Sequence, residues 1–125
     1  MRSDFTLLVS AIALVYLSGC GLNTRTTIES PASTQFPTDA DSLDFWDTLE
    51  IQPVTTNDDA LHGLLLLVQQ DPPAESWESR LSAAQNRGWI GEKTTLEPKE
   101  SAQMGMIAVC LCDILDVQGG LSMRI

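Results

Sequence analysis

The chain has 125 residues, with seventeen Asp and Glu against seven Lys and Arg, and a net charge of −10. Such an acidic chain is a poor candidate for nucleic-acid binding, because phosphates call for a basic surface. No apolar run reaches the roughly 20 residues of a bilayer span. No structural zinc site is predicted from the three Cys and one His, and the length allows one small domain.

The N-terminus has the pattern of an export signal. Arg2 precedes a mostly apolar run over Phe5–Leu17, which has the length of a secretory h-region. The run ends in Leu17, Ser18, Gly19 and Cys20. These four residues resemble the lipobox of bacterial lipoproteins. The resemblance implies cleavage before Cys20, a diacylglycerol on its sulfur and acylation of the new N-terminus. An ordinary secretory signal, with Cys20 as a free or paired thiol, is the alternative.

The lipoprotein reading also predicts a location. Residues 1–19 are the cleaved signal peptide, and two or more acyl chains on Cys20 anchor stably in a membrane. The mature protein then lies in the cell envelope, facing the periplasm or exposed at the surface. The resemblance further implies outer-membrane sorting, because Gly21 stands where an Asp favours retention in the inner membrane.

Residues 20–41 are predicted to be the lipidated Cys and a disordered tether. The stretch 23–41 is rich in Thr, Ser and Pro, and such composition buries too little surface to order a chain. Between Arg25 and Arg80 there is no Lys or Arg, and several acids occur. They indicate a solvated, self-repelling surface. Their spacing does not match a calcium-binding loop, so no metal site is predicted.

The stretch 42–51 is expected to be the first helix of the domain. Ser42 is its predicted N-cap, and Phe45, Trp46 and Leu49 form an apolar side. We expect these side chains to pack in a core; a segment that binds a partner is the alternative. Pro53 ends the helix.

The second helix is predicted over residues 57–69. Asn57 or Asp58 is the expected N-cap. Leucines follow at helical spacing and widen into a stripe that indicates burial on most sides. His62 lies on this helix with no second His and no Cys nearby, so neither catalysis nor metal binding is assigned to it.

The third helix is predicted over residues 74–87. Trp77, Leu81 and Ala84 form its apolar stripe. Gly88 follows where a left-handed C-cap is expected. Trp89 comes next, and we expect it to fold back on the end of the helix.

The last helix is predicted over residues 98–117, with Pro98 in its first turn and Gly119 and Gly120 after its end. Its apolar face comprises Met104, Ile107, Ala108, Leu111 and Leu115. Cys110 and Cys112 diverge by about 200° on a helix, and a bond between them would break it. Both are predicted to be buried. The chain stops on the apolar Ile125, for which a truncated gene product is one explanation.

Residues 74–117 resemble a single S-layer homology repeat, in which a helix with a Trp near its start leads through a Gly turn and a Pro-containing loop to a second helix. The stretch 60–121 is also similar to uncharacterised envelope lipoproteins of planctomycete type. The features that carry the resemblance to the S-layer homology repeat are Trp77, Arg80, Leu81, Ala84, Gly88–Ile90, Leu96–Pro98, Ile107, Ala108 and Leu111. S-layer homology domains bind cell-wall polysaccharide with three repeats and a Thr-Arg pair. This chain has one repeat-like unit without that pair, so the resemblance assigns carbohydrate binding to no residue.

The sequence therefore predicts an all-α domain of three to four helices over residues 42–125, behind a signal and a tether. No nucleophile–base pair and no phosphate loop occurs, so neither enzymatic activity nor a cofactor is predicted. The leading hypothesis is a structural or adaptor lipoprotein, whose partners are the membrane, through the lipid on Cys20, and an envelope protein or cell-wall polysaccharide. The alternative is a cell-wall carbohydrate-binding module in which Trp77 and Trp89 contact the ligand.

Overall fold

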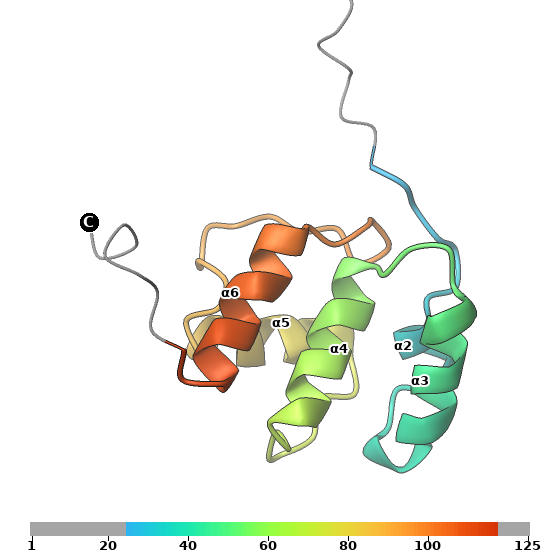
Figure 1. Ribbon diagram of the computed structural model, residues 1–125, viewed down its shortest axis with the longest axis horizontal. Coiled ribbons are helices and arrows are strands. Elements are labelled where there is room, and N and C mark those ends of the chain that lie inside the picture. Colours follow the sequence, from blue (N-terminus) through green and yellow to red (C-terminus); the bar gives the residue numbers. More distant parts are fainter. Residues whose placement is uncertain (1–24, 118–125) are drawn as a thin grey trace, which may run out of the picture.

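The computed structural model describes residues 25–117, which form five α-helices, one 3₁₀ turn and two isolated bridges (Figure 1). The prediction of an all-α fold is confirmed. The elements in chain order are α2 (Ala32–Gln35), η1 (Asp39–Asp41), α3 (Ser42–Ile51), α4 (Asn57–Leu67), α5 (Trp77–Asn86) and α6 (Met104–Ile114). The signal peptide, the lipobox with Cys20 and the tail after Val117 lie outside the described residues.

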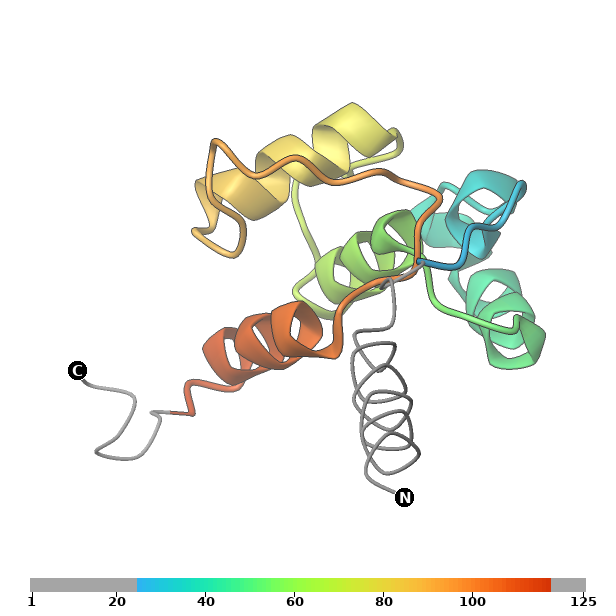
Figure 2. The same cartoon turned by 90° about the horizontal axis from the view of Figure 1, so that it is seen from above.

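Helix α4 is the centre of the fold. It contacts α2, α3, α5 and α6 (Figures 1 and 2). Its first nine residues, from Asn57 to Leu65, are all buried, as the leucine stripe predicted. The core beside it combines side chains from α4, α5, α6 and the loops before and after α5, namely Leu61, Leu64, Leu65, Ala74, Ala84, Trp89, Ile90 and Cys110. Burial of this apolar surface is the main force that holds α4, α5 and α6 together.

The helix starts depend on capping residues that lie one position earlier than expected. Thr56, rather than Asn57 or Asp58, caps α4: its side chain accepts from the amide of Asp59, whose carboxylate accepts from the amide of Thr56. This reciprocal pair is a capping box. The N-cap of α3 is Asp41 instead of Ser42, and no side chain caps that helix, because the turn η1 runs directly into it.

The end of α5 follows the prediction. Gly88 has φ of +75°, the left-handed conformation that favours glycine at a helix C-terminus. The chain then reverses, and the amide of Trp89 donates to the carbonyl of Ala84 over 3.0 Å. Trp89 and Ile90 return to the core with 7% and 5% of their surface exposed.

Helix α6 begins at Met104, later than the predicted start at Pro98. Residues 98–101 are needed elsewhere, because their backbone meets the start of α4: the amide of Asn57 donates to the carbonyl of Glu100, and that of Asp58 to Pro98. These bonds satisfy amides that the first turn of a helix leaves without partners. The helix also ends earlier, at Ile114, and Asp116 has φ of +51°.

The N-terminal segment corrects the predicted tether. The expectation of disorder up to residue 41 is wrong for residues 25–41, which contain α2 and η1 and belong to the fold. Ala32 and Ser33 are fully buried against α4. An isolated bridge pairs Thr27 with Glu100. Polar bonds to α4 and α5, described next, order a segment whose apolar content alone is too small to do so.

Candidate functional site

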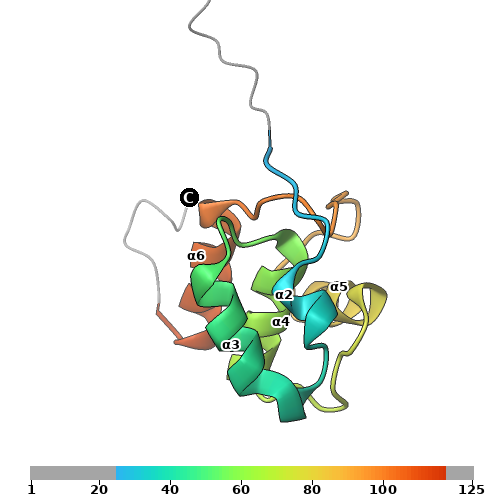
Figure 3. The same cartoon turned by 90° about the vertical axis from the view of Figure 1, so that its right-hand side faces the viewer.

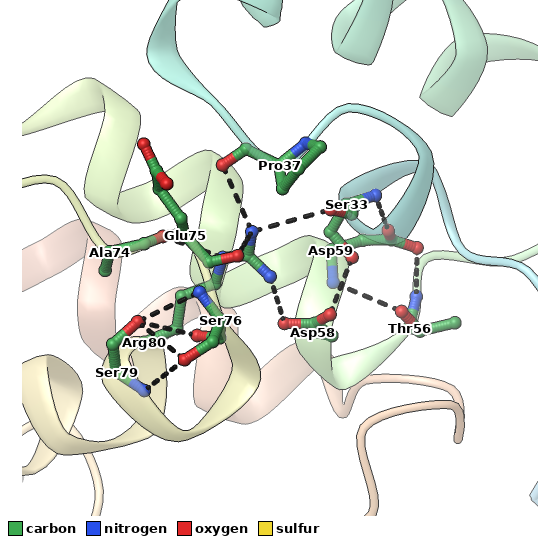
Figure 4. Close-up of polar contacts among 10 residues, drawn as sticks. All are labelled: Ser33, Pro37, Thr56, Asp58, Asp59, Ala74, Glu75, Ser76, Ser79 and Arg80. Atoms are coloured by element: carbon green, nitrogen blue, oxygen red, sulfur yellow. Dashed lines mark hydrogen bonds and ion pairs between the residues drawn. The ribbon is translucent and has the colours of Figure 1, made fainter.

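A buried ion pair joins α4 to α5. The guanidinium of Arg80 donates from Nη1 to Oδ1 of Asp58 over 2.8 Å, and the two side chains are 2% and 6% exposed (Figure 4). The Nε of Arg80 donates to the carbonyl of Ala74, and Nη2 donates to carbonyls of the segment before α3 and of the loop before α5. Arg80 thus satisfies its charge and its donors inside the protein.

A second set of bonds attaches α2 to the start of α4. The hydroxyl of Ser33 donates to Oδ2 of Asp58, and its amide donates to Oδ1 of Asp59, both over 2.9 Å (Figure 4). Oδ2 of Asp59 accepts from the amide of Thr56 and from Nε2 of Gln52. Because every group in this cluster has a partner, its chemistry is structural: it fixes residues 25–41 on the helical core.

His62 lies one helical turn beyond this cluster and is 2% exposed. Its ring packs edge-on against Phe45, with centroids 4.6 Å apart, and its Nε2 has no hydrogen-bond partner. Burial and, after it, the positive charge of Arg80 lower the pKa of His62 from 6.5 to about 4. Among residues 25–117 no Ser or Cys is hydrogen-bonded to His62, and no group of three metal-binding side chains occurs.

The two tryptophans proposed as ligand contacts lie in different places. Trp89 is buried, and its Nε1 donates to Asp113 over 2.7 Å. Trp77 is half-buried and lines a cavity of about 330 Å³ together with Arg80 and Asp58. Trp89 lines a separate cavity of about 150 Å³. The rings therefore form no joint platform, and the carbohydrate-binding role of either residue stays a prediction.

The two cysteines of α6 differ in environment. Cys110 is fully buried in the core, and burial raises the pKa of its thiol. Cys112 is exposed, so the prediction that both are buried is wrong for Cys112. The reason is the rotation of about 200° between them on a helix of which only one side meets α4.

An apolar groove is the feature of the described residues best suited to bind something. Its floor is the outer side of α4, and its walls are α3 and α6, which flank α4 (Figures 1 and 3). It encloses about 260 Å³. The apolar lining consists of Trp46, Leu49, Ala60, Gly63, Leu64, Leu67, Ile107 and Leu111. Gly63 lets the ring of Trp46 lie close to α4, since a Cβ at this position would be 2.9 Å from that ring.

Apolar side chains next to the groove remain in contact with solvent. Leu67, which lines the groove at the end of α4, is 57% exposed. Met104, at the start of α6, and Leu115, just after its end, are 79% and 68% exposed. The apolar face predicted for α6 as core is therefore wrong, because none of its five residues is buried. The side of α6 that meets the core comprises Cys110, with Met106 and Ile114 packed beside it. Exposed apolar side chains that line a groove are typical of interaction sites.

The sequence did not predict the groove, because each run of apolar residues at helical spacing was interpreted as a buried face. The signal was present in α6, which has one charged residue, Asp113, among eleven. A helix that is apolar on all sides needs partners on all sides, and the described residues supply a partner on one side. The prediction for α3 comes closer to the structure, because partner binding is the stated alternative to a core position for Trp46.

A scan against protein-family models and searches of curated proteins and solved structures return no match for this chain. Over residues 25–117, no helix combines the length and apolar character needed to cross a bilayer.

Proposed function

We propose that this chain is a lipid-anchored envelope protein with a structural or adaptor role and no catalytic activity of its own. The observation that carries the proposal is the lipobox, Leu17-Ser18-Gly19-Cys20, at the end of an apolar run of signal-peptide length. The open apolar groove beside α6 supports an adaptor role, since it is a surface suited to a partner. The outer membrane is the proposed location, on the basis of Gly21.

The order of residues 25–41 shortens the connection between the proposed lipid on Cys20 and the domain. Cys20 and Arg25, the first described residue, are five positions apart, and five residues extend over at most about 18 Å. A lipid on Cys20 would therefore keep the edge formed by residues 25–29 and 97–101 near the bilayer. The long spacer expected from residues 20–41 would have placed the domain farther away and in no fixed orientation.

The lipid is tested by intact mass and by Triton X-114 partitioning of the protein from its own membranes. We expect a mass of residues 20–125 plus diacylglycerol and acyl chains, with the protein in the detergent phase. Cys20→Ala should abolish both, and the matched control Cys112→Ala, at an exposed cysteine, should change neither. A bare-peptide mass for the wild type, or detergent partitioning unaffected by Cys20→Ala, would refute the anchor.

The short connection is tested separately, with a paramagnetic label on lipid headgroups in nanodiscs. Amide signals near Thr27 and Glu100, beside the start of α4, should broaden more than those near Gln69, at the opposite end of that helix. Insertion of ten Gly and Ser residues after Arg25 should remove the difference. Equal broadening across the domain before the insertion would contradict a domain held close to the bilayer.

A further inference from the structure

We infer that the groove between α3, α4 and α6 binds the apolar face of a cationic amphipathic helix of a partner protein. The inference rests on the adaptor role proposed above and names the chemistry of the partner. It is carried by the shape of the groove together with the charges that surround it.

The shape favours a helix over a small molecule. The groove volume of about 260 Å³ is below the roughly 300–1,000 Å³ typical of small-molecule sites. The groove extends along α4, where Ala60, Gly63 and Leu67 follow one another at helical spacing. The flanking helices have ten and eleven residues, a length of about 16 Å. An amphipathic helix of two to three turns fits such a groove with two or three side chains inserted.

The charges determine the sign of the partner. The three helices around the groove contain no Lys or Arg, and their only His is buried with a lowered pKa. Glu50 is exposed on α3 and lies one helical turn after Trp46, on the same side of that helix. The wall from α6 adds no positive charge. A partner with Lys or Arg beside its apolar residues therefore meets a complementary rim.

The groove also has an acidic end. Trp46 and Leu67 line, on their other side, a second cavity of about 480 Å³ that includes Asp39 and Asp71. Both acids are exposed. This cavity lies at the C-terminal end of α4, where the helix dipole is negative. We therefore expect one cationic side chain of the bound helix beside these two carboxylates.

The same charges disfavour the two other occupants of an apolar groove. In a symmetric dimer across this face, two acidic rims would approach each other, and like charges at an interface cost several kcal/mol. An anionic membrane would be repelled by the same rim. Only a cationic partner satisfies both the apolar lining and the acids.

The probes are two synthetic 14-residue helical peptides with the same Leu spacing, one completed with Lys and the other with Glu, each with one photoreactive leucine. The protein is the full lipidated chain in phosphatidylcholine nanodiscs, with empty nanodiscs as reference. We expect the Lys peptide to bind saturably with one peptide per protein, and at least tenfold more tightly than the Glu peptide. Cross-links should fall on Trp46, Leu67 or Leu111.

Matched variants distinguish the groove from general acidity. Glu50→Lys with Asp71→Lys should weaken the Lys peptide about tenfold, whereas the same reversals at exposed Glu75 and Glu78 should not. Because all four positions are exposed, we expect these variants to fold, and amide spectra check this. Equal weakening by both pairs, cross-links outside the groove, or preference for the Glu peptide would overturn the inference. A dimer in native mass spectrometry that becomes more stable with Glu50→Lys would also overturn it. Lipidation is scored by mass, so failure of the anchor is visible separately from failure of peptide binding.

Discussion

Replacing Arg80 by Met tests the buried cluster that attaches the N-terminal segment to the core. The substitution keeps a long apolar stem and removes the guanidinium. It leaves Asp58 with one remaining side-chain partner, the hydroxyl of Ser33, in a site where the carboxylate is 6% exposed. It also removes the donor that reaches the carbonyls of Pro37 and Glu75.

The magnitude follows from the burial of the pair. Removing one partner of a buried ion pair costs roughly 3–5 kcal/mol, because the other charge is left uncompensated. Arg80→Met should therefore lower the free energy of unfolding by about 4 kcal/mol, a large part of the stability of a small domain. The matched control is Arg87→Met, which removes exposed bonds to Gln70 and a cation–π contact with Trp89 and should cost about 1 kcal/mol.

Urea unfolding gives the free energies, and amide exchange at Ser33 reports whether α2 detaches first. Asp58→Asn is the milder second variant, for use where Arg80→Met does not fold. The double variant should be more stable than the sum of the two single losses by at least about 1 kcal/mol, since it leaves no unpaired charge. The reasoning is wrong if Arg80→Met is no more destabilising than Arg87→Met, or if the two single effects add.

Three further predictions concern other parts of the domain. The pKa of His62 is about 4 in the folded protein and 6.5 in the unfolded chain. The free energy of unfolding should therefore be highest above pH 6.5 and fall by about 3 kcal/mol towards pH 4, because protons bind the unfolded chain first. His62→Phe should flatten that part of the pH profile, and an unchanged profile would contradict the prediction. Gly105→Ala should stabilise its helix by up to about 1 kcal/mol, because the new Cβ meets no atom within 4 Å. Gly63→Ala should gain less or lose stability, because its Cβ would lie 2.9 Å from the ring of Trp46. Thermal unfolding compares the two variants, and equal gains would exclude that contact. An alkylating reagent should modify Cys112 readily in the native state and Cys110 only on unfolding, because the latter is buried with a raised pKa; equal rates by mass spectrometry would contradict the placement of α6.

The sequence alone determined the class and much of the order of the helices. The recurrence of apolar residues at helical spacing is a local property of the chain. The sequence therefore predicts α3 with its observed bounds, and α4 and α5 within a few residues. Gly88 ended α5 for a reason that is also local, its access to positive φ. The lipobox is likewise a linear signal, although Cys20 lies outside the described residues.

Only the tertiary structure decided what the N-terminal segment does. The stretch 25–41 has a composition typical of a tether, but Ser33 finds two carboxylates on α4, and Arg80 reaches back from α5 to the same place. Such order depends on partners 25 and 47 positions away in the chain. No local pattern encodes those distances.

The apolar groove was decided by tertiary structure for the same reason. The apolar residues that line it are evident in the sequence, but an apolar stripe does not determine which part of it other helices will cover. That depends on how many helices surround α4 and at which rotation α6 meets it. In this domain α6 turns Cys110 inward and leaves Leu111 and Leu115 at the surface, so a helix that its sequence assigns to the core becomes the wall of an open groove.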